Sequence, residues 1–189
     1  MGSQAVLRVS GRGVLKTFHK ASHCDMEAAC LAKGFRNVIP LVERVGPKSL
    51  LLPYRRGGDL MDRAMRGETP KVSIVTDLSD ALREVHAADI VHCDVKPENI
   101  MVRDDGTYEL IDFGLASFKG SQLAGSTKSY SLDTGGRAHP DQDWWALGCT
   151  LGVLFSRAMP PPNLREHWPG SEKWPVEIQS AVARYLRSI

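Results

Sequence analysis

The stretch 92–99, which reads HCDVKPEN, constrains this chain more than any other part of the sequence. Further along, Asp112-Phe113-Gly114 adds a second acidic motif. Transfer of a phosphoryl group requires a carboxylate beside the attacking hydroxyl and oxygen ligands for magnesium. Asp94 suits the first requirement, and Asn99 with Asp112 suits the second. The two motifs together therefore indicate a magnesium-assisted phosphoryl-transfer site.

Two short apolar runs, 100–103 and 108–111, lie between these motifs and are separated by Asp104-Asp105-Gly106. Apolar runs joined by an acidic, glycine-containing turn are typical of a β-hairpin. We expect the hairpin to bring Asn99 at its start close to Asp112 at its end. Two metal ligands that are distant in sequence would then meet at one Mg²⁺ ion.

The paired motifs resemble the catalytic loop H-R-D-x-K-x-x-N and the metal loop D-F-G of the eukaryotic protein kinase family. All of these positions are matched except the arginine, which is Cys93. Lys96, two positions after Asp94, resembles the serine/threonine branch of that family. The resemblance implies an α+β bilobal fold, with a reduced β-rich small lobe and a mainly helical large lobe. It also implies ATP and Mg²⁺ as cofactors and a Ser/Thr-containing protein as substrate.

Composition limits the other classes of function. The chain has 189 residues, of which 42% are hydrophobic, enough for one compact domain over 1–189 or two small lobes around a cleft. Its net charge of +2 predicts neither DNA nor RNA as a partner. Four cysteines without a CxxC pair favour a reduced protein inside the cell, in the cytoplasm or nucleus. The longest apolar run, 144–155, is too short to span a membrane.

The resemblance implies a small lobe over about 1–54. Runs 5–9 and 14–18 read as strands, and Lys16 falls where the family has its phosphate-binding lysine, although Lys20 is close enough to compete. The pattern over 23–34 predicts a helix whose Glu27 either pairs with that lysine or lies on an exposed helix face.

Further features of this lobe predict which of its residues contact the nucleotide. Residues 2–5 resemble the tail of the family's glycine-rich loop, with Ala5 replacing its last glycine. Because close approach of backbone to phosphate favours glycine, this loop would cover a nucleotide poorly. Runs 38–45 and 49–52 read as two more strands, Leu52 is the expected gatekeeper, and Tyr54 belongs to the hinge.

The large lobe would occupy about 55–189. Apolar residues spaced at three and four predict a helix over 71–88, and 114–136 corresponds to the activation segment, which lacks the family's A-P-E triplet. Thr127 matches the threonine that contacts the catalytic carboxylate, with Ser126 and Thr134 as alternatives.

Asp143 is predicted to cap a buried helix that runs through residue 155. The resemblance also implies that it holds the catalytic-loop backbone. Residues 159–175 read as a loop, and 176–189 as a last helix.

The sequence thus predicts a serine/threonine protein kinase, trimmed at both ends and similar in brevity to the compact kinases of large DNA viruses, in which case it would act in the host cell. Control is expected to come from expression level or from a bound regulatory protein partner. One alternative is a pseudokinase that binds nucleotide or protein without chemistry. A small-molecule kinase of related fold is the third reading, since such enzymes usually lack the D-F-G loop.

Overall fold

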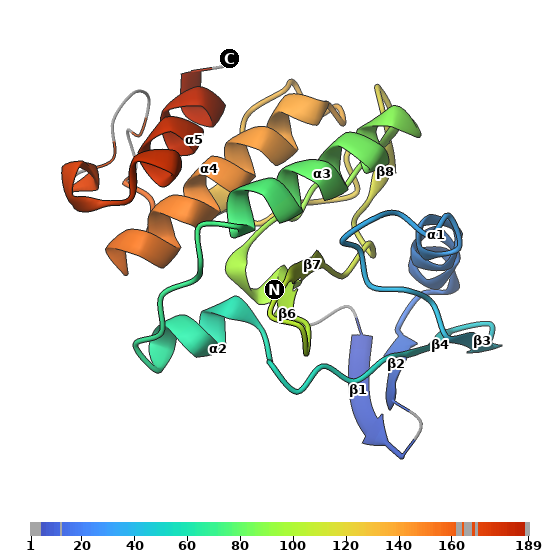
Figure 1. Ribbon diagram of the computed structural model, residues 1–189. Coiled ribbons are helices and arrows are strands. Elements are labelled where there is room, and N and C mark those ends of the chain that lie inside the picture. Colours follow the sequence, from blue (N-terminus) through green and yellow to red (C-terminus); the bar gives the residue numbers. More distant parts are fainter. Residues whose placement is uncertain (1–4, 12, 162–163, 165–167, 169, 188–189) are drawn as a thin grey trace.

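The computed structural model describes residues 5–11, 13–161, 164, 168 and 170–187. Its N-terminal part is a four-stranded antiparallel sheet in the order β1-β2-β4-β3. Figure 1 shows this sheet, with helix α1 beside it, apart from the long C-terminal helices. The elements of this part are β1 (Ala5–Ser10), β2 (Gly13–Phe18), α1 (Ala21–Leu31), β3 (Glu43–Gly46) and β4 (Ser49–Leu52).

The C-terminal part is mainly helical, which confirms the predicted α+β class. Two short antiparallel strand pairs, β5–β8 and β6–β7, lie among its helices. The β6–β7 pair is the hairpin predicted from the apolar runs. The elements are α2 (Leu60–Met65), α3 (Ile74–Ala87), β5 (Ile90–Val91), η1 (Pro97–Asn99), β6 (Ile100–Val102), β7 (Tyr108–Leu110), β8 (Ser117–Phe118), η2 (Lys128–Tyr130), α4 (Pro140–Ser156), η3 (Ser171–Lys173) and α5 (Val176–Arg187).

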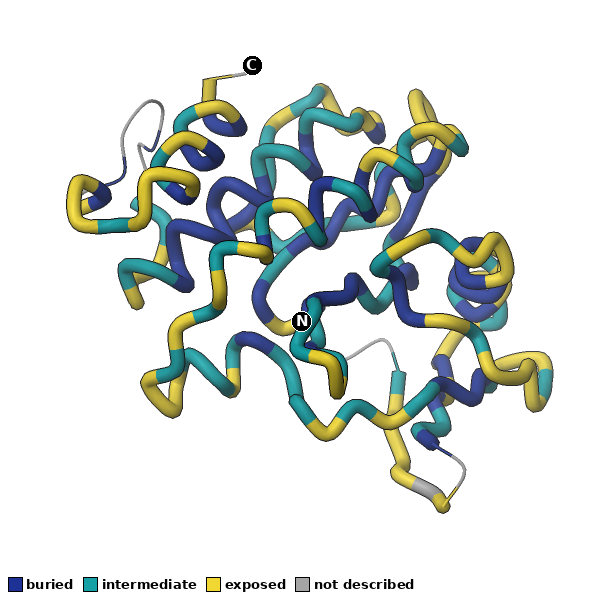
Figure 2. Tube along the Cα trace, viewed as in Figure 1, coloured by how far each residue is buried: buried dark blue, intermediate teal, exposed yellow. Residues whose placement is uncertain are grey.

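Helix α4 forms the centre of the C-terminal core. Its residues from Ala146 to Leu154 are all buried, as expected for a helix that is apolar on every side. Figure 2 shows this buried stretch between the neighbouring helices. Gly152 allows the closest packing, because a Cβ at this position would lie 2.2 Å from the ring of Trp168. Thr150 of this helix donates to Val95 O at 3.5 Å, which ties the stretch 92–99 to the packed core.

The strand predicted over 38–45 is wrong for most of its length. Strand β3 begins only at Glu43, and Val38 makes a single parallel bridge with Leu110 of β7. Pro40 lies within the run and has no N–H to donate to a neighbouring strand. This segment therefore crosses from the sheet to the β6–β7 hairpin, where Ile39 N donates to Leu110 O at 3.0 Å.

The predicted capping role of Asp143 is also wrong. Helix α4 begins at Pro140, and His139 is its N-cap residue, in a capping box with Gln142. Proline at the first helical position is pre-organised for a helix start, which explains why the helix begins three residues before Asp143. Asp143 therefore lies inside the first turn, completely buried.

The remaining boundaries differ by a few residues from those predicted. Helix α1 covers Ala21–Leu31, α3 covers Ile74–Ala87, and the predicted loop over 159–175 contains the short turn η3. The predicted last helix is α5, and residues 188–189 lie outside the described residues. Of the glycine-rich-loop residues 2–5, only Ala5 is described. Within the described ranges, no helix combines the length and apolar character needed to cross a bilayer.

Candidate active site

Lys16 lies at the centre of a charged cluster where the N-terminal sheet meets the D-F-G segment. Its Nζ donates to Glu27 Oε1 at 2.9 Å and Oε2 at 2.7 Å, and to Asp112 Oδ1 at 2.7 Å. The side chains of Lys16 and Glu27 are 7% and 0% exposed, whereas that of Asp112 is 45% exposed. The structure therefore pairs Lys16 with Glu27, and not the competing Lys20, and leaves part of the Asp112 carboxylate accessible.

The charges of this cluster depend on one another. Burial would lower the pKa of Lys16, but the carboxylates of Glu27 and Asp112 outweigh it, so the pKa is raised. Desolvation acts to raise the pKa of Asp112, but the Lys16 ammonium outweighs it and the pKa is lowered. Burial raises the pKa of Glu27 to about 7 against the pull of Lys16. Lys16 therefore keeps its positive charge, and the Asp112 carboxylate keeps a negative charge that can bind a cation.

The catalytic-loop stretch forms a second polar cluster around Asp94. Thr127 Oγ1 donates to Asp94 Oδ1 at 2.6 Å, and Lys96 Nζ lies 2.8 Å from Asp94 Oδ2 and 3.0 Å from Thr127 Oγ1. Of the three candidates weighed from sequence, it is Thr127 that contacts Asp94. Thr134 instead donates to Arg137 O. The carboxylate of Asp94 is therefore held in one orientation from two sides.

Asn99 is orientated by the same carboxylate. Its Nδ2 donates to the backbone O of Asp94 at 2.8 Å and to Asp94 Oδ2 at 3.0 Å. These bonds assign the amide nitrogen, so Oδ1 is the atom of Asn99 that remains to accept a cation. Across the hairpin, Ile111 N donates to Asn99 O at 3.0 Å, which places Asn99 opposite the residue before Asp112.

Asp143 fixes the backbone of the catalytic-loop stretch through hydrogen bonds to its carboxylate. Its two carboxylate oxygens accept from His92 N and Cys93 N, each at 2.8 Å, and Oδ2 also contacts His86 Nε2 at 2.8 Å. Cys93 has a left-handed φ of +68°, which side chains with a Cβ rarely adopt. The two N–H bonds to Asp143 oppose the relaxation of this strained residue. Asp143 is thus a positioning residue, as the resemblance implied.

His92 links the catalytic loop to the D-F-G segment. Asp94 N donates to His92 Nδ1 at 3.2 Å, so the ring proton lies on Nε2, which donates to Ile111 O at 2.9 Å. The ring also meets Phe113 edge to face, with centroids 4.6 Å apart. His92 is fully buried and has a structural role.

A mostly apolar cavity of about 340 Å³ opens beside Lys16 and Asp112. Three residues predicted to bind nucleotide line it: Ala5 from β1, Leu52 from the end of β4, and Tyr54 from the segment that follows. Other lining residues are Leu7, Val9, Val14, Phe18, Ile39, Pro53, Arg55, Asp59, Glu98, Met101 and Ile111. An apolar cavity with a cation and a carboxylate at its edge has the character of a small-ligand site.

Comparison with known proteins decides the family. A sequence model of the protein kinase domain matches residues 35–168, which include the Asp94 loop and the D-F-G segment. The chain belongs to the protein kinase domain family.

Several curated kinases are similar to this chain. CBL-interacting protein kinase 5 of Oryza sativa subsp. japonica is 29% identical over 173 residues, covering 79% of this chain and 38% of that protein. The calcium and calcium/calmodulin-dependent serine/threonine-protein kinase DMI-3 of Medicago truncatula is 35% identical over 121 residues, covering 57% and 23%. Serine/threonine-protein kinase cds1 of Schizosaccharomyces pombe is 30% identical over 129 residues, covering 59% and 28%. The chain therefore spans less than half of each relative's length.

Two contacts of this protein kinase domain were not predicted from its sequence. Arg55 forms a bidentate ion pair with the buried Glu109, with Nη2 donating to Oε2 at 2.9 Å, and so ties the segment after β4 to the strand that leads into Asp112. Thr134 accepts from Gln142 Nε2 and anchors the activation segment to α4. The only available signal was Glu109 itself, because a charged residue within an apolar strand needs a partner.

Proposed function

We propose that the chain transfers the γ-phosphate of ATP to a Ser or Thr hydroxyl of a protein. The observation that carries this proposal is that Asn99 joins two charged clusters, since its Nδ2 donates to Asp94 Oδ2 and its backbone O accepts from Ile111 N, the residue before Asp112. One is the Lys16–Glu27–Asp112 cluster, and the other is Asp94 held by Lys96 and Thr127.

Magnesium and ATP fit the residues that are present. Asp112 is ionised and partly exposed, and the amide of Asn99 is turned so that its oxygen is the free atom, which matches the oxygen ligands that Mg²⁺ prefers. Bound magnesium would neutralise charge on the phosphate oxygens. The apolar walls formed by Ala5, Leu52 and Met101 suit the base of a nucleotide, with Tyr54 at the rim.

Each polar side chain then has a distinct task. Lys16, held by Glu27, supplies a fixed positive charge to the phosphates. Asp94 orients the acceptor hydroxyl and takes its proton. Lys96 lies beside both Asp94 and Thr127, where its ammonium stabilises the charge that moves with the transferred group.

The acceptor chemistry is tested by phospho-amino-acid analysis. Purified chain is incubated with γ-labelled ATP, Mg²⁺ and a generic protein substrate, and the labelled substrate is hydrolysed. Phosphoserine and phosphothreonine are the expected products. Label found only on tyrosine, or only as free phosphate, would contradict the proposal.

A second candidate function is a module that binds nucleotide or protein without transferring phosphate. Two observations favour it. Leu7 and Val9 of β1, which line the nucleotide cavity, are 63% and 70% exposed, so the cavity is poorly covered there. The sequence also lacks the A-P-E triplet with which the family closes its activation segment, and a hydrogen bond from Gln142 Nε2 to Thr134 Oγ1 anchors the segment in its place. The cluster that holds Asp94 disfavours this second function, since a module that only binds does not require a positioned base.

Magnesium dependence of nucleotide binding gives a first prediction. ATP at about ten times its Kd should stabilise the protein by about 1.4 kcal/mol and raise Tm by about 3–6 °C, provided that Mg²⁺ is present. Asp112→Ala should remove this rise, because it removes the ionised ligand. Thermal unfolding with ATP, with and without Mg²⁺, measures both effects. A rise that is independent of Mg²⁺, or that persists in Asp112→Ala, counts against Asp112 as a metal ligand.

Phosphorylation of the activation segment should not be required for activity. The residue before Asp94 is Cys93. A thiol has no cationic form, and burial raises the pKa of this one to about 12, so it stays neutral and cannot pair with a phosphate. Backbone bonds hold the segment instead: Gly120 N donates to Ala138 O, and Ala138 N to Ser121 O, both at 2.8 Å. Phosphatase treatment, verified by mass spectrometry, should leave the initial rate within about twofold. A larger fall, reversed by rephosphorylation of one segment residue, would show that a cation such as Arg137 binds the phosphate.

A further inference from the structure

Strand β1 forms one edge of the four-stranded sheet, and its side chains are exposed. Figure 1 shows β1 at the end of the sheet, and Figure 2 shows that most of its length is exposed. Three of its large apolar side chains, Val6, Leu7 and Val9, are 49%, 63% and 70% exposed. Every other described helix or strand exposes at most one large apolar side chain in this way. Apolar surface gathered on one element marks an interaction site.

The backbone of β1 has open hydrogen-bonding groups along its outer side. Phe18 N of β2 donates to Lys48 O, on the side of β4, so alternate residues of β2 bond toward β4 and those between them bond toward β1. Leu7 of β1 lies opposite Lys16, which belongs to the set that bonds toward β4, and Val9 follows the same alternation. The N–H and C=O groups of Leu7 and Val9 therefore point away from the sheet, and no other part of the described chain bonds to them.

The opposite edge of the same sheet is protected against further pairing, whereas β1 is not. Strand β3 has four residues, its register with β4 shifts between Arg44 and Gly46, and Pro47 follows it. Short length, an irregular register and a proline all hinder the addition of another strand. Strand β1 has six residues in unbroken register with β2 and contains no proline. The edge at β1 can therefore accept another strand along its length.

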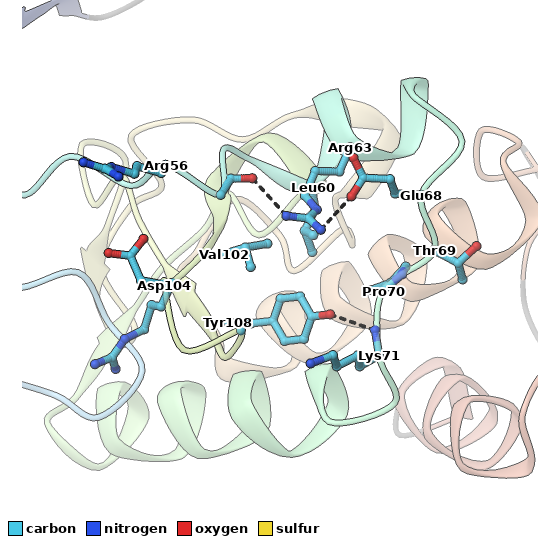
Figure 3. Close-up of a pocket in the computed structure, with 13 residues that line it drawn as sticks. Arg56, Leu60, Arg63, Glu68, Thr69, Pro70, Lys71, Val102, Asp104 and Tyr108 are labelled. Carbon is cyan, nitrogen blue, oxygen red and sulfur yellow. Dashed lines mark hydrogen bonds and ion pairs between the residues drawn. The ribbon is translucent and has the colours of Figure 1, made fainter.

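A cavity of about 480 Å³ between α2 and the β6–β7 hairpin lacks such open groups at its centre. Figure 3 shows that the central polar groups are already paired, Arg63 with Glu68 and the Tyr108 hydroxyl with Lys71 N. A ligand in this cavity would compete with these bonds, whereas a strand beside β1 would form new ones. The edge of the sheet is thus the stronger docking surface.

We propose that β1 pairs antiparallel with β1 of a second copy of this chain, with Leu7 opposite Leu7 of the second copy. In this register Val9 lies opposite Ala5 and Arg8 opposite Val6, so each outward-facing backbone group meets one of the other copy and no like charges are opposed. Moving the register so that Leu7 met Val9 would place the two Arg8 side chains directly opposite each other. The net charge of +2 adds little repulsion between two copies.

The second copy would also contribute side chains to the cavity beside Lys16 and Asp112. Leu7 and Val9 line this cavity and are its exposed wall at β1. Residues opposite each other on paired strands have their side chains on the same face of the sheet. Leu7 of the second copy therefore lies on the cavity face and extends the exposed wall. The inference concerns the association of two chains, so it is independent of phosphate transfer.

Sedimentation velocity at about 1–300 µM protein tests the association. The wild-type chain should reach twice the monomer mass, with a Kd of about 100 µM or below, as expected of a small interface. Leu7→Lys and Leu7→Glu each place like charges opposite each other and should weaken the dimer at least about 10-fold. Because residue 7 faces residue 7, an equimolar mixture of the two variants should restore the dimer.

Met65→Lys is the matched control, because Met65 of α2 is 80% exposed and lies outside the sheet. This variant should associate within about twofold of wild type, and circular dichroism verifies that all variants fold. The proposal is overturned by a wild type that stays monomeric at about 300 µM, by equal weakening in Met65→Lys, or by a mixture of the Leu7 variants that stays monomeric. The mixture thus separates this register from pairing of β1 with a different strand.

Discussion

Replacing Asp94 by Asn should lower the rate of phosphate transfer by about 10²–10⁴-fold, because a positioned general base contributes about that factor. Asn keeps an oxygen to accept from Thr127, which donates at 2.6 Å, and it has nearly the same shape. It loses the negative charge that attracts Lys96 at 2.8 Å and has no basic oxygen to take the hydroxyl proton. Fold and nucleotide binding should therefore be retained while the chemistry is lost.

Initial rates of wild type and Asp94→Asn, from matched preparations, measure this effect. Thermal unfolding with Mg²⁺ and ATP serves as the control, and the two proteins should show the same ligand-induced rise in Tm. Equal transfer rates would mean that the activity does not come from this site. A variant that loses both the rate and the rise in Tm would assign Asp94 a structural role instead.

Replacing Asp143 by Ala should destabilise the protein by about 3–5 kcal/mol. The side chain is fully buried and accepts from His92 N, Cys93 N and His86. Removing it leaves two buried backbone N–H groups unsatisfied, at about 1–3 kcal/mol each, and takes away the partner of His86 Nε2.

Urea unfolding compares Asp143→Ala with Asp141→Ala, which removes a carboxylate from the same helical turn. Asp141 is only half-buried and contacts His139, so its loss should cost about 1 kcal/mol or less. A difference between the two variants of less than about 1 kcal/mol would show that Asp143 does not hold the loop. The large loss expected for Asp143 should be accompanied by reduced nucleotide-dependent stabilisation, because Asp143 also supports His92 and hence the D-F-G segment.

The sequence predicted which polar side chains lie close together around Asp94, because the motifs that contain them are short and local. Residues 92–99 contain Asp94, Lys96 and Asn99 on one loop, and the turn residues 104–106 predicted the hairpin that returns the chain to Asp112. The pairing of Lys16 with Glu27 could not be predicted from a local motif, since neither residue belongs to one. It followed from the resemblance, and the structure places the two side chains in contact.

The features that the sequence did not reveal depend on tertiary partners. Residues 38–42 look like a strand, but Pro40 and a bridge to Leu110 take them across to the hairpin. Asp143 looks like a cap, but Pro140 starts the helix earlier and turns the carboxylate inward. The Arg55–Glu109 pair joins residues 54 positions apart in the sequence. The division into lobes near residue 55 stays a prediction.

The most direct measurement is the initial rate of label transfer from γ-labelled ATP to a protein substrate, with Mg²⁺, after chelation by EDTA, and after Mg²⁺ is restored. If Asp94, Lys96, Lys16, Asn99 and Asp112 form one phosphotransfer centre, label should reach Ser or Thr with Mg²⁺, stop with EDTA and resume with Mg²⁺. The contradicting result is a protein that Mg²⁺ and ATP stabilise against heat but that transfers no label. Such a protein would be a nucleotide-binding module and not an enzyme.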